Sequence, residues 1–160
     1  MITTLLKAIR ALPTCEIYPP TQLPTLRQGH ILPDDLVEFY QLCGGLVLYA
    51  ESAFPITIVP PQDIVPANSV LFAGLDEQDI TTIYSHPSWS WYILCDYCDS
   101  NYLTIDLSKE RLGYCYDSRW EIHPGNSFMI ARNFTDLLVL LLARNWGIGA
   151  PEFSDLGRTI

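Results

Sequence analysis

The stretch from Trp89 to Asp117 constrains the fold more than any other part of the chain. It predicts three successive strands: Trp91–Asp96, Asn101–Leu107 and Gly113–Asp117. In the middle strand apolar and polar side chains alternate, with the apolar positions at Leu103, Ile105 and Leu107, which is the two-residue period of a strand with one buried face. Turns this short allow only antiparallel neighbours, because a parallel return needs a crossover of about a dozen residues. The segment therefore predicts an antiparallel meander.

Helices are predicted before the meander. Apolar residues from Leu5 to Leu12 form the stripe of a short amphipathic helix that Pro13 ends, and an irregular linker follows from Thr14 to Ile31. A second helix begins near Pro33, because proline suits the first helical turn and the following aspartates suit the positive end of the helix dipole. Its apolar stripe is followed by Gly44-Gly45, and its members are Leu36, Phe39, Tyr40 and Cys43.

The remaining segments predict short strands, a loop and one more helix. The strand candidates are Leu46–Ala50, Phe54–Val59, Val70–Ala73 and Phe128–Ala131. A loop is expected at Asp76–Pro87. The last helix has Asn133 as its N-cap with Asp136 three residues later, and it closes at Gly147. Helices, then a run of strands, then a helix indicate an α+β fold with a mainly antiparallel sheet, flanked by N-terminal helices and one C-terminal helix.

Charge is distributed very unevenly along the chain. The net charge is −9, and no lysine or arginine occurs from residue 28 to residue 108, a stretch that holds eleven acidic residues. Such a stretch disfavours nucleic acid, whose phosphates are bound by basic side chains. An acidic face would instead attract a basic protein partner. The alternative is that the acidic surface only maintains solubility.

Four acidic residues are the best candidates for contact with a partner, because they fall at positions predicted to be exposed. Asp76, Glu77 and Asp79 lie in the expected loop, and Asp99 lies in the first turn of the meander.

No catalytic motif is recognisable. The chain lacks a Gly-x-Ser-x-Gly motif, a phosphate-binding glycine loop and a His-Glu-x-x-His motif. The three histidines, His30, His86 and His123, fall at predicted loop positions. Asp96, Asp99 and Asp106 could cluster at strand ends for acid–base work or cation binding, but turn and surface positions are the simpler interpretation. We therefore expect a protein without enzymatic activity, with a small hydrolase or a metal-binding protein as a minor alternative.

The cysteines indicate reduced thiols rather than a disulfide framework. There are five, an odd number, and no secretory signal is recognisable. Cys95 and Cys98 have zinc-ligand spacing, with Cys115 and His123 as conceivable partners, but a second pair is missing and Cys95 alternates with core positions. We expect no metal and no cofactor. The apolar runs are too short to span a membrane, so a cytoplasmic protein is expected.

Three segments resemble the SUKH superfamily, which includes fungal Smi/Knr-type regulators and bacterial immunity proteins. Leu32–Gly45 is similar to the opening helix of the family. Trp91–Asp96 followed by Asn101–Leu107 is similar to its meander, although the turn between them lacks the glycine expected there. Ile130–Leu138 is similar to its closing helix.

The resemblance implies one SUKH-like domain over residues 1–149 and a C-terminal tail over residues 150–160. It also implies a protein-binding function: neutralisation of a cognate toxin, commonly a nuclease, by occlusion of its active site. A regulatory or scaffold module of the Smi/Knr type is the alternative. The expected partner is a basic toxin domain rather than nucleic acid or a membrane.

Overall fold

The computed structural model describes residues 1–72 and 86–143. Its helices are α1 (Ile2–Arg10), α2 (Asp34–Leu42), α3 (Ala67–Leu71) and α5 (Phe134–Ala143), with short 3-10 turns at η1 (Pro61–Asp63) and η2 (Pro87–Ser90). The strands are β1 (Glu16–Ile17), β2 (Leu46–Leu48), β3 (Ile56–Ile58), β4 (Trp91–Asp96), β5 (Tyr102–Asp106), β6 (Cys115–Asp117) and β7 (Phe128–Ala131).

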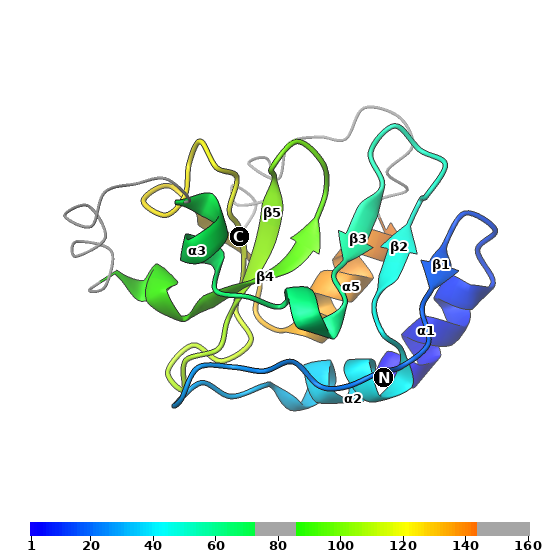
Figure 1. Ribbon diagram of the computed structural model, residues 1–160. Helices are drawn as coiled ribbons and strands as arrows, with labels where there is room; N and C mark the ends of the chain where they lie inside the picture. The colour runs from blue at the N-terminus through cyan, green and yellow to red at the C-terminus, as the bar shows by residue number, and fades with distance from the viewer. Residues whose placement is uncertain (73–85, 144–160) are drawn as a thin grey trace.

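The strands form one sheet in which spatial order follows chain order from β1 to β7 (Figure 1). Every neighbouring pair is antiparallel. The predicted meander is therefore confirmed, and it extends over the whole sheet. The α+β class with helices at both ends of the chain is confirmed as well.

One face of the sheet carries the main core. Helices α1, α2 and α5 contact one another there, and α5 lies behind β2 and β3 in Figure 1. The rings of Phe39 on α2 and Phe134 on α5 meet edge to face with centroids 4.9 Å apart. The predicted apolar stripe of α2 is buried, and so are the three predicted core positions of the meander, Leu103, Ile105 and Leu107.

The opposite face is covered too, which corrects the expectation of a strand buried on one side only. Thr104 and Asp106 alternate with the core positions, yet both are fully buried. On this face the ring of Trp91 stacks on Tyr116 with centroids 3.9 Å apart, and α3 contacts β4 in front of the sheet (Figure 1). A period-2 pattern alone cannot reveal this second cover, because short polar side chains can be buried when they are hydrogen-bonded.

Two local predictions were wrong. Val70 and Leu71 belong to α3 rather than to a strand, with Pro66 as the N-cap residue. Proline is compatible with the start of a helix, and this outweighs the strand propensity of one valine. The predicted irregular linker also contains a short edge strand, because Glu16 and Ile17 pair with Val47 and Leu46.

The start of α5 confirms the predicted cap. The side chain of Asn133 accepts a hydrogen bond from the amide of Asp136 at 2.7 Å and donates one to its carboxylate at 2.8 Å. Asp35 of α2 adds a second cap, since its Oδ2 accepts from the amide of Thr135 at 2.8 Å and from its hydroxyl at 3.0 Å. The predicted end at Gly147 and the predicted tail lie outside the described residues.

Candidate functional site

The first meander turn places Asp99 on the surface, as predicted. The backbone φ angles in this turn are 79° at Cys98, 51° at Asp99 and 62° at Ser100. Residues other than glycine rarely adopt this left-handed region. The backbone of this turn would suit a glycine, the residue that the family resemblance predicts here. The turn is held by hydrogen bonds from the amide of Cys98 to Asp96 Oδ1 at 3.1 Å and from the amide of Asn101 to the carbonyl of Cys98 at 2.9 Å.

The other three predicted contact residues, Asp76, Glu77 and Asp79, lie outside the described residues. The structure therefore places only Asp99 of the predicted set.

Two hollows open beside this turn, on the face of the sheet opposite α5. One is about 250 Å³ and is lined by Val70, Leu71, Ser100, Tyr102 and Trp120. The other is about 240 Å³ and shares Val70 and Tyr102 with the first; its remaining lining residues are Val59, Asp63, Val65, Ile93 and Asp96. The two hollows adjoin at Val70 and Tyr102, and together we call them the hairpin groove.

The register of the sheet explains which side chains reach the groove. Cys95 lies opposite Ile58 and Leu103, and all three are buried under the helices. The next cross-strand pair is Asp96 and Tyr102, and their side chains therefore point to the other face of the sheet. Burial, and to a lesser extent the charge of Asp96, raises the pKa of Tyr102 above its ordinary value. Tyr102 therefore stays protonated and neutral at pH 7.

Sequence reasoning missed the two most exposed apolar residues of the groove. Trp120 is 62% exposed and Val70 is 36% exposed. Trp120 lies three positions after the end of β6, in a segment without helical or strand periodicity. Nothing in the sequence therefore distinguishes this exposed tryptophan from one buried in the core. Val70 was missed because it was assigned to a strand.

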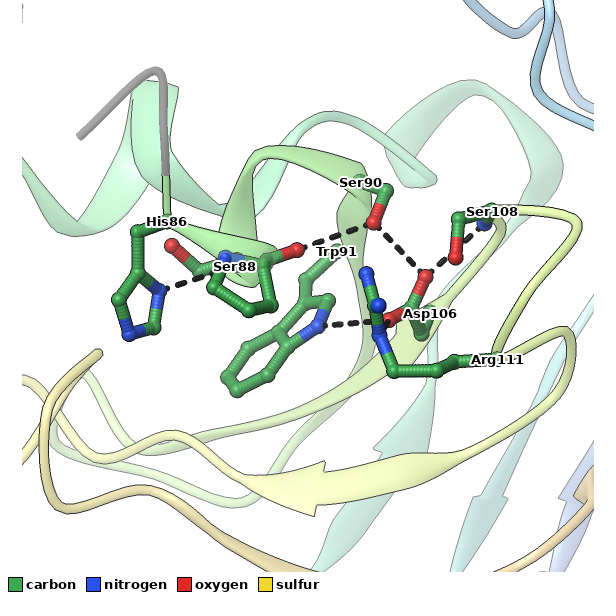
Figure 2. A network of polar contacts seen from close by, with 8 residues as sticks. His86, Ser88, Ser90, Trp91, Asp106, Ser108 and Arg111 are labelled. Carbon is green, nitrogen blue, oxygen red and sulfur yellow. Dashed lines mark hydrogen bonds and ion pairs between the residues drawn. The ribbon is translucent and has the colours of Figure 1, made fainter.

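Asp106 is not a surface residue, which corrects the simpler interpretation of this carboxylate. It is fully buried and accepts four hydrogen bonds (Figure 2). The donors are Ser90 Oγ at 2.7 Å, Trp91 Nε1 at 3.0 Å, the amide of Ser108 at 2.9 Å and Arg111 Nε at 2.7 Å. This is the satisfied arrangement that a buried carboxylate requires.

The three carboxylates considered for acid–base work do not form a cluster. Asp96 and Asp99 lie at the turn end of the β4–β5 hairpin, whereas Asp106 pairs with Trp91 at its open end. The four donors around Asp106 hold the start of β4, the end of β5 and the following turn together. We therefore interpret Asp106 as a structural residue.

The histidines differ from one another in their surroundings. His123 lies in a turn, as predicted, and it is buried there; burial, with a smaller effect from His86, lowers its pKa to about 4. Its Nε2 lies 2.7 Å from Asn68 Oδ1. Because an amide oxygen only accepts, Nε2 carries the proton. His30 has a different neighbour: its Nδ1 lies 2.8 Å from the hydroxyl of Tyr92.

The described residues contain no group of three or more histidine, cysteine, aspartate or glutamate side chains that could hold a metal ion. Cys95 and Cys115 are fully buried, as expected for Cys95, and burial raises the pKa of both thiols. A protonated thiol is a poor nucleophile and a poor metal ligand. Within residues 1–72 and 86–143, no helix is both long enough and apolar enough to cross a bilayer.

Comparison with known proteins identifies the family. The profile of the SMI1 / KNR4 family (SUKH-1) matches residues 26–139, which include α2, the sheet from β2 to β7 and the hairpin groove. The chain belongs to this family. The resemblance of the three segments to the SUKH superfamily is thereby confirmed.

A curated relative matches almost the whole chain. It is 37% identical over 161 residues, covering 98% of this chain and 93% of its own length, and it is the immunity protein YokJ of Bacillus subtilis (strain 168). No solved structure matches the chain significantly.

Proposed function

We propose that this SUKH-1 protein is an immunity protein that binds a cognate toxin and occludes its active site. The observation that carries the proposal is the 37% identity, over nearly the full length of both chains, to a protein named as an immunity protein. Identity over the whole length argues for a shared function better than a shared fold does, because one fold can host many functions.

The chemistry of the described residues supports binding rather than catalysis. The buried carboxylate of Asp106 has its hydrogen-bonding capacity taken up by four protein donors. His123 is buried and held by Asn68. A protein of this kind protects by forming a one-to-one complex, and it needs neither a cofactor nor a metal. We propose that the chain is not an enzyme and that it acts in the cytoplasm of the cell that produces it.

The proposed partner is a basic toxin domain, with a nuclease as the expected activity. Nucleases bind a polyanion and therefore carry basic grooves, to which an acidic surface is complementary. Asp99 and the three acidic residues Asp76, Glu77 and Asp79 remain candidates for this contact.

Co-expression provides the test. We expect a toxin gene beside this one, and its product should arrest growth when it is expressed alone in a host that lacks the immunity gene. Co-expression of the wild-type chain should restore growth, and size-exclusion chromatography should yield a one-to-one complex with an inactivated toxin. An unrelated toxin serves as the control and should not be neutralised. Absence of both protection and complex, with capture of an endogenous regulator instead, would favour the Smi/Knr-type alternative.

A further inference from the structure

We propose that the hairpin groove is the docking surface, and that it takes a segment of the toxin in which an arginine lies next to an apolar residue. This inference rests on the proposed function and specifies the site and the chemistry of the partner.

One aromatic side chain of the groove is unusually open to solvent. Trp120 is 62% exposed, the largest exposed fraction of any large apolar side chain in the described residues apart from the terminal Met1. It lines one hollow together with Val70 and Tyr102. Tryptophan and tyrosine dominate the residues that contribute most to protein interfaces, because they bury a large area at a small cost in conformational entropy.

The edge of the groove carries negative charge without a compensating cation. Asp63 and Asp96 line the second hollow. The ion pairs found in the described part of the chain are Arg111–Asp106 and Arg119–Asp117, so neither Asp63 nor Asp96 has a cationic partner there. Both carboxylates also belong to the stretch from residue 28 to residue 108 without lysine or arginine. We assign the complementary cation to the partner.

An aromatic ring and a carboxylate that are cross-strand neighbours favour arginine as the cation that binds in the groove. Tyr102 and Asp96 are cross-strand neighbours on the groove face. A planar guanidinium can stack on an aromatic ring while its N–H groups form a fork with a carboxylate, which the ammonium of lysine cannot do. Trp120 and Val70 would then pack against the apolar residue that lies next to this arginine in the toxin segment.

The dimensions of the groove suit side chains of a protein segment. The hollows are about 250 Å³ and about 240 Å³. Two adjoining hollows of this size suit two neighbouring side chains of one chain segment.

The first test truncates the exposed tryptophan. Trp120→Ala should weaken binding to the inactivated neighbouring toxin by roughly 30-fold or more in calorimetry, as expected of an interface hot spot. Tyr18→Ala is the matched control. Tyr18 is an aromatic residue 41% exposed that follows β1 at the opposite edge of the sheet, and its removal should leave affinity within about threefold, the range of a residue outside a hot spot.

The second test removes the negative charges of Asp63 and Asp96 at the edge of the groove. Asp96→Asn retains the oxygen that accepts from the amide of Cys98, so it removes charge while it preserves the turn. Asp96→Asn and Asp63→Asn should each lower the association rate, and more at low salt than at high salt. The control is Asp34→Asn, an exposed aspartate at the start of α2 in the helix layer, and it should not change the rate.

Three outcomes would overturn the inference. Wild-type protein that does not bind the toxin overturns the proposed function together with the groove assignment. Wild-type protein that binds, with Trp120→Ala and Asp96→Asn binding equally well, overturns the groove assignment alone. Sedimentation that shows a wild-type dimer and a Trp120→Ala monomer of unchanged toxin affinity would assign the groove to a second copy of this chain.

Discussion

Ile105 lies at the centre of the sheet, opposite Tyr92 of β4 and Cys115 of β6, and all three residues are fully buried. Truncation there removes apolar contacts and leaves a cavity. We expect Ile105→Ala to lower the free energy of unfolding by about 2–5 kcal/mol in urea denaturation. Val139→Ala on the exposed side of α5, where Val139 is 45% exposed, should stay within about 0.5 kcal/mol of the wild type. Equal effects of the two changes would contradict the burial of Ile105.

Asp106 provides a second test at the residue scale. Asp106→Asn keeps the shape of the side chain but replaces one acceptor oxygen by an amide NH2 group, a donor that faces donors such as Trp91 Nε1 or Ser90 Oγ. Each buried donor left without an acceptor should cost about 1–3 kcal/mol of stability. Asp99→Asn, the same chemical change on the exposed turn, is the control and should be nearly neutral. A neutral Asp106→Asn would mean that the network contributes nothing to folding.

The lowered pKa of His123 should make the stability of the protein depend on pH. Its pKa is lowered from 6.5 to about 4 in the folded protein, so between these values the unfolded chain binds a proton that the folded chain does not. The free energy of unfolding should therefore fall as pH drops from about 6.5 towards 4. His30, whose pKa is also lowered by burial and by Arg27, adds to the same trend.

The measurement is urea denaturation at pH 7 and at pH 5. His123→Gln cannot titrate, so the loss of stability between the two pH values should be smaller in this variant than in the wild type, with a remainder from His30. Histidine NMR titration reads the pKa directly. A His123 resonance that titrates near 6.5 would contradict the burial of this ring.

At the scale of elements, the junction of α2 and α5 depends on one carboxylate. Asp35 is the second residue of α2 and caps α5 through the amide and hydroxyl of Thr135. Asp35→Ala removes this cap and should cost about 1–2 kcal/mol. Hydrogen exchange should become faster in the first turn of α5. Asp34→Ala, the neighbouring exposed aspartate in the same first turn of α2, is the control, and an equal effect would assign the loss to α2 instead.

The charge distribution belongs to the scale of the whole molecule. Rates of association with a basic toxin should fall as salt rises, because charges are screened beyond about 10 Å at 0.1 M. Changing Asp76, Glu77, Asp79 and Asp99 together to Asn or Gln should lower the association rate in surface plasmon resonance. The melting temperature should change little, since isolated surface charges contribute little to folding. A rate insensitive to salt and to these changes would mean that the charge serves solubility alone.

The sequence determined most of the elements and their order, but not α3 or β1. The alternation in β5, the apolar stripe of α2 and the cap at Asn133 are local patterns, and each acts over a few residues, so each could be read without knowledge of the fold. Short turns then required antiparallel neighbours. The family resemblance followed from the same segments.

Only the tertiary structure decided what covers the second face of the sheet. The burial of Asp106 depends on donors up to 16 residues away in sequence, and the cap of α5 by Asp35 joins residues 100 positions apart. The hairpin groove likewise combines Val70, Tyr102 and Trp120 from three separate segments. A local pattern shows that a side chain is polar or apolar, but burial and partnership depend on which distant segments meet.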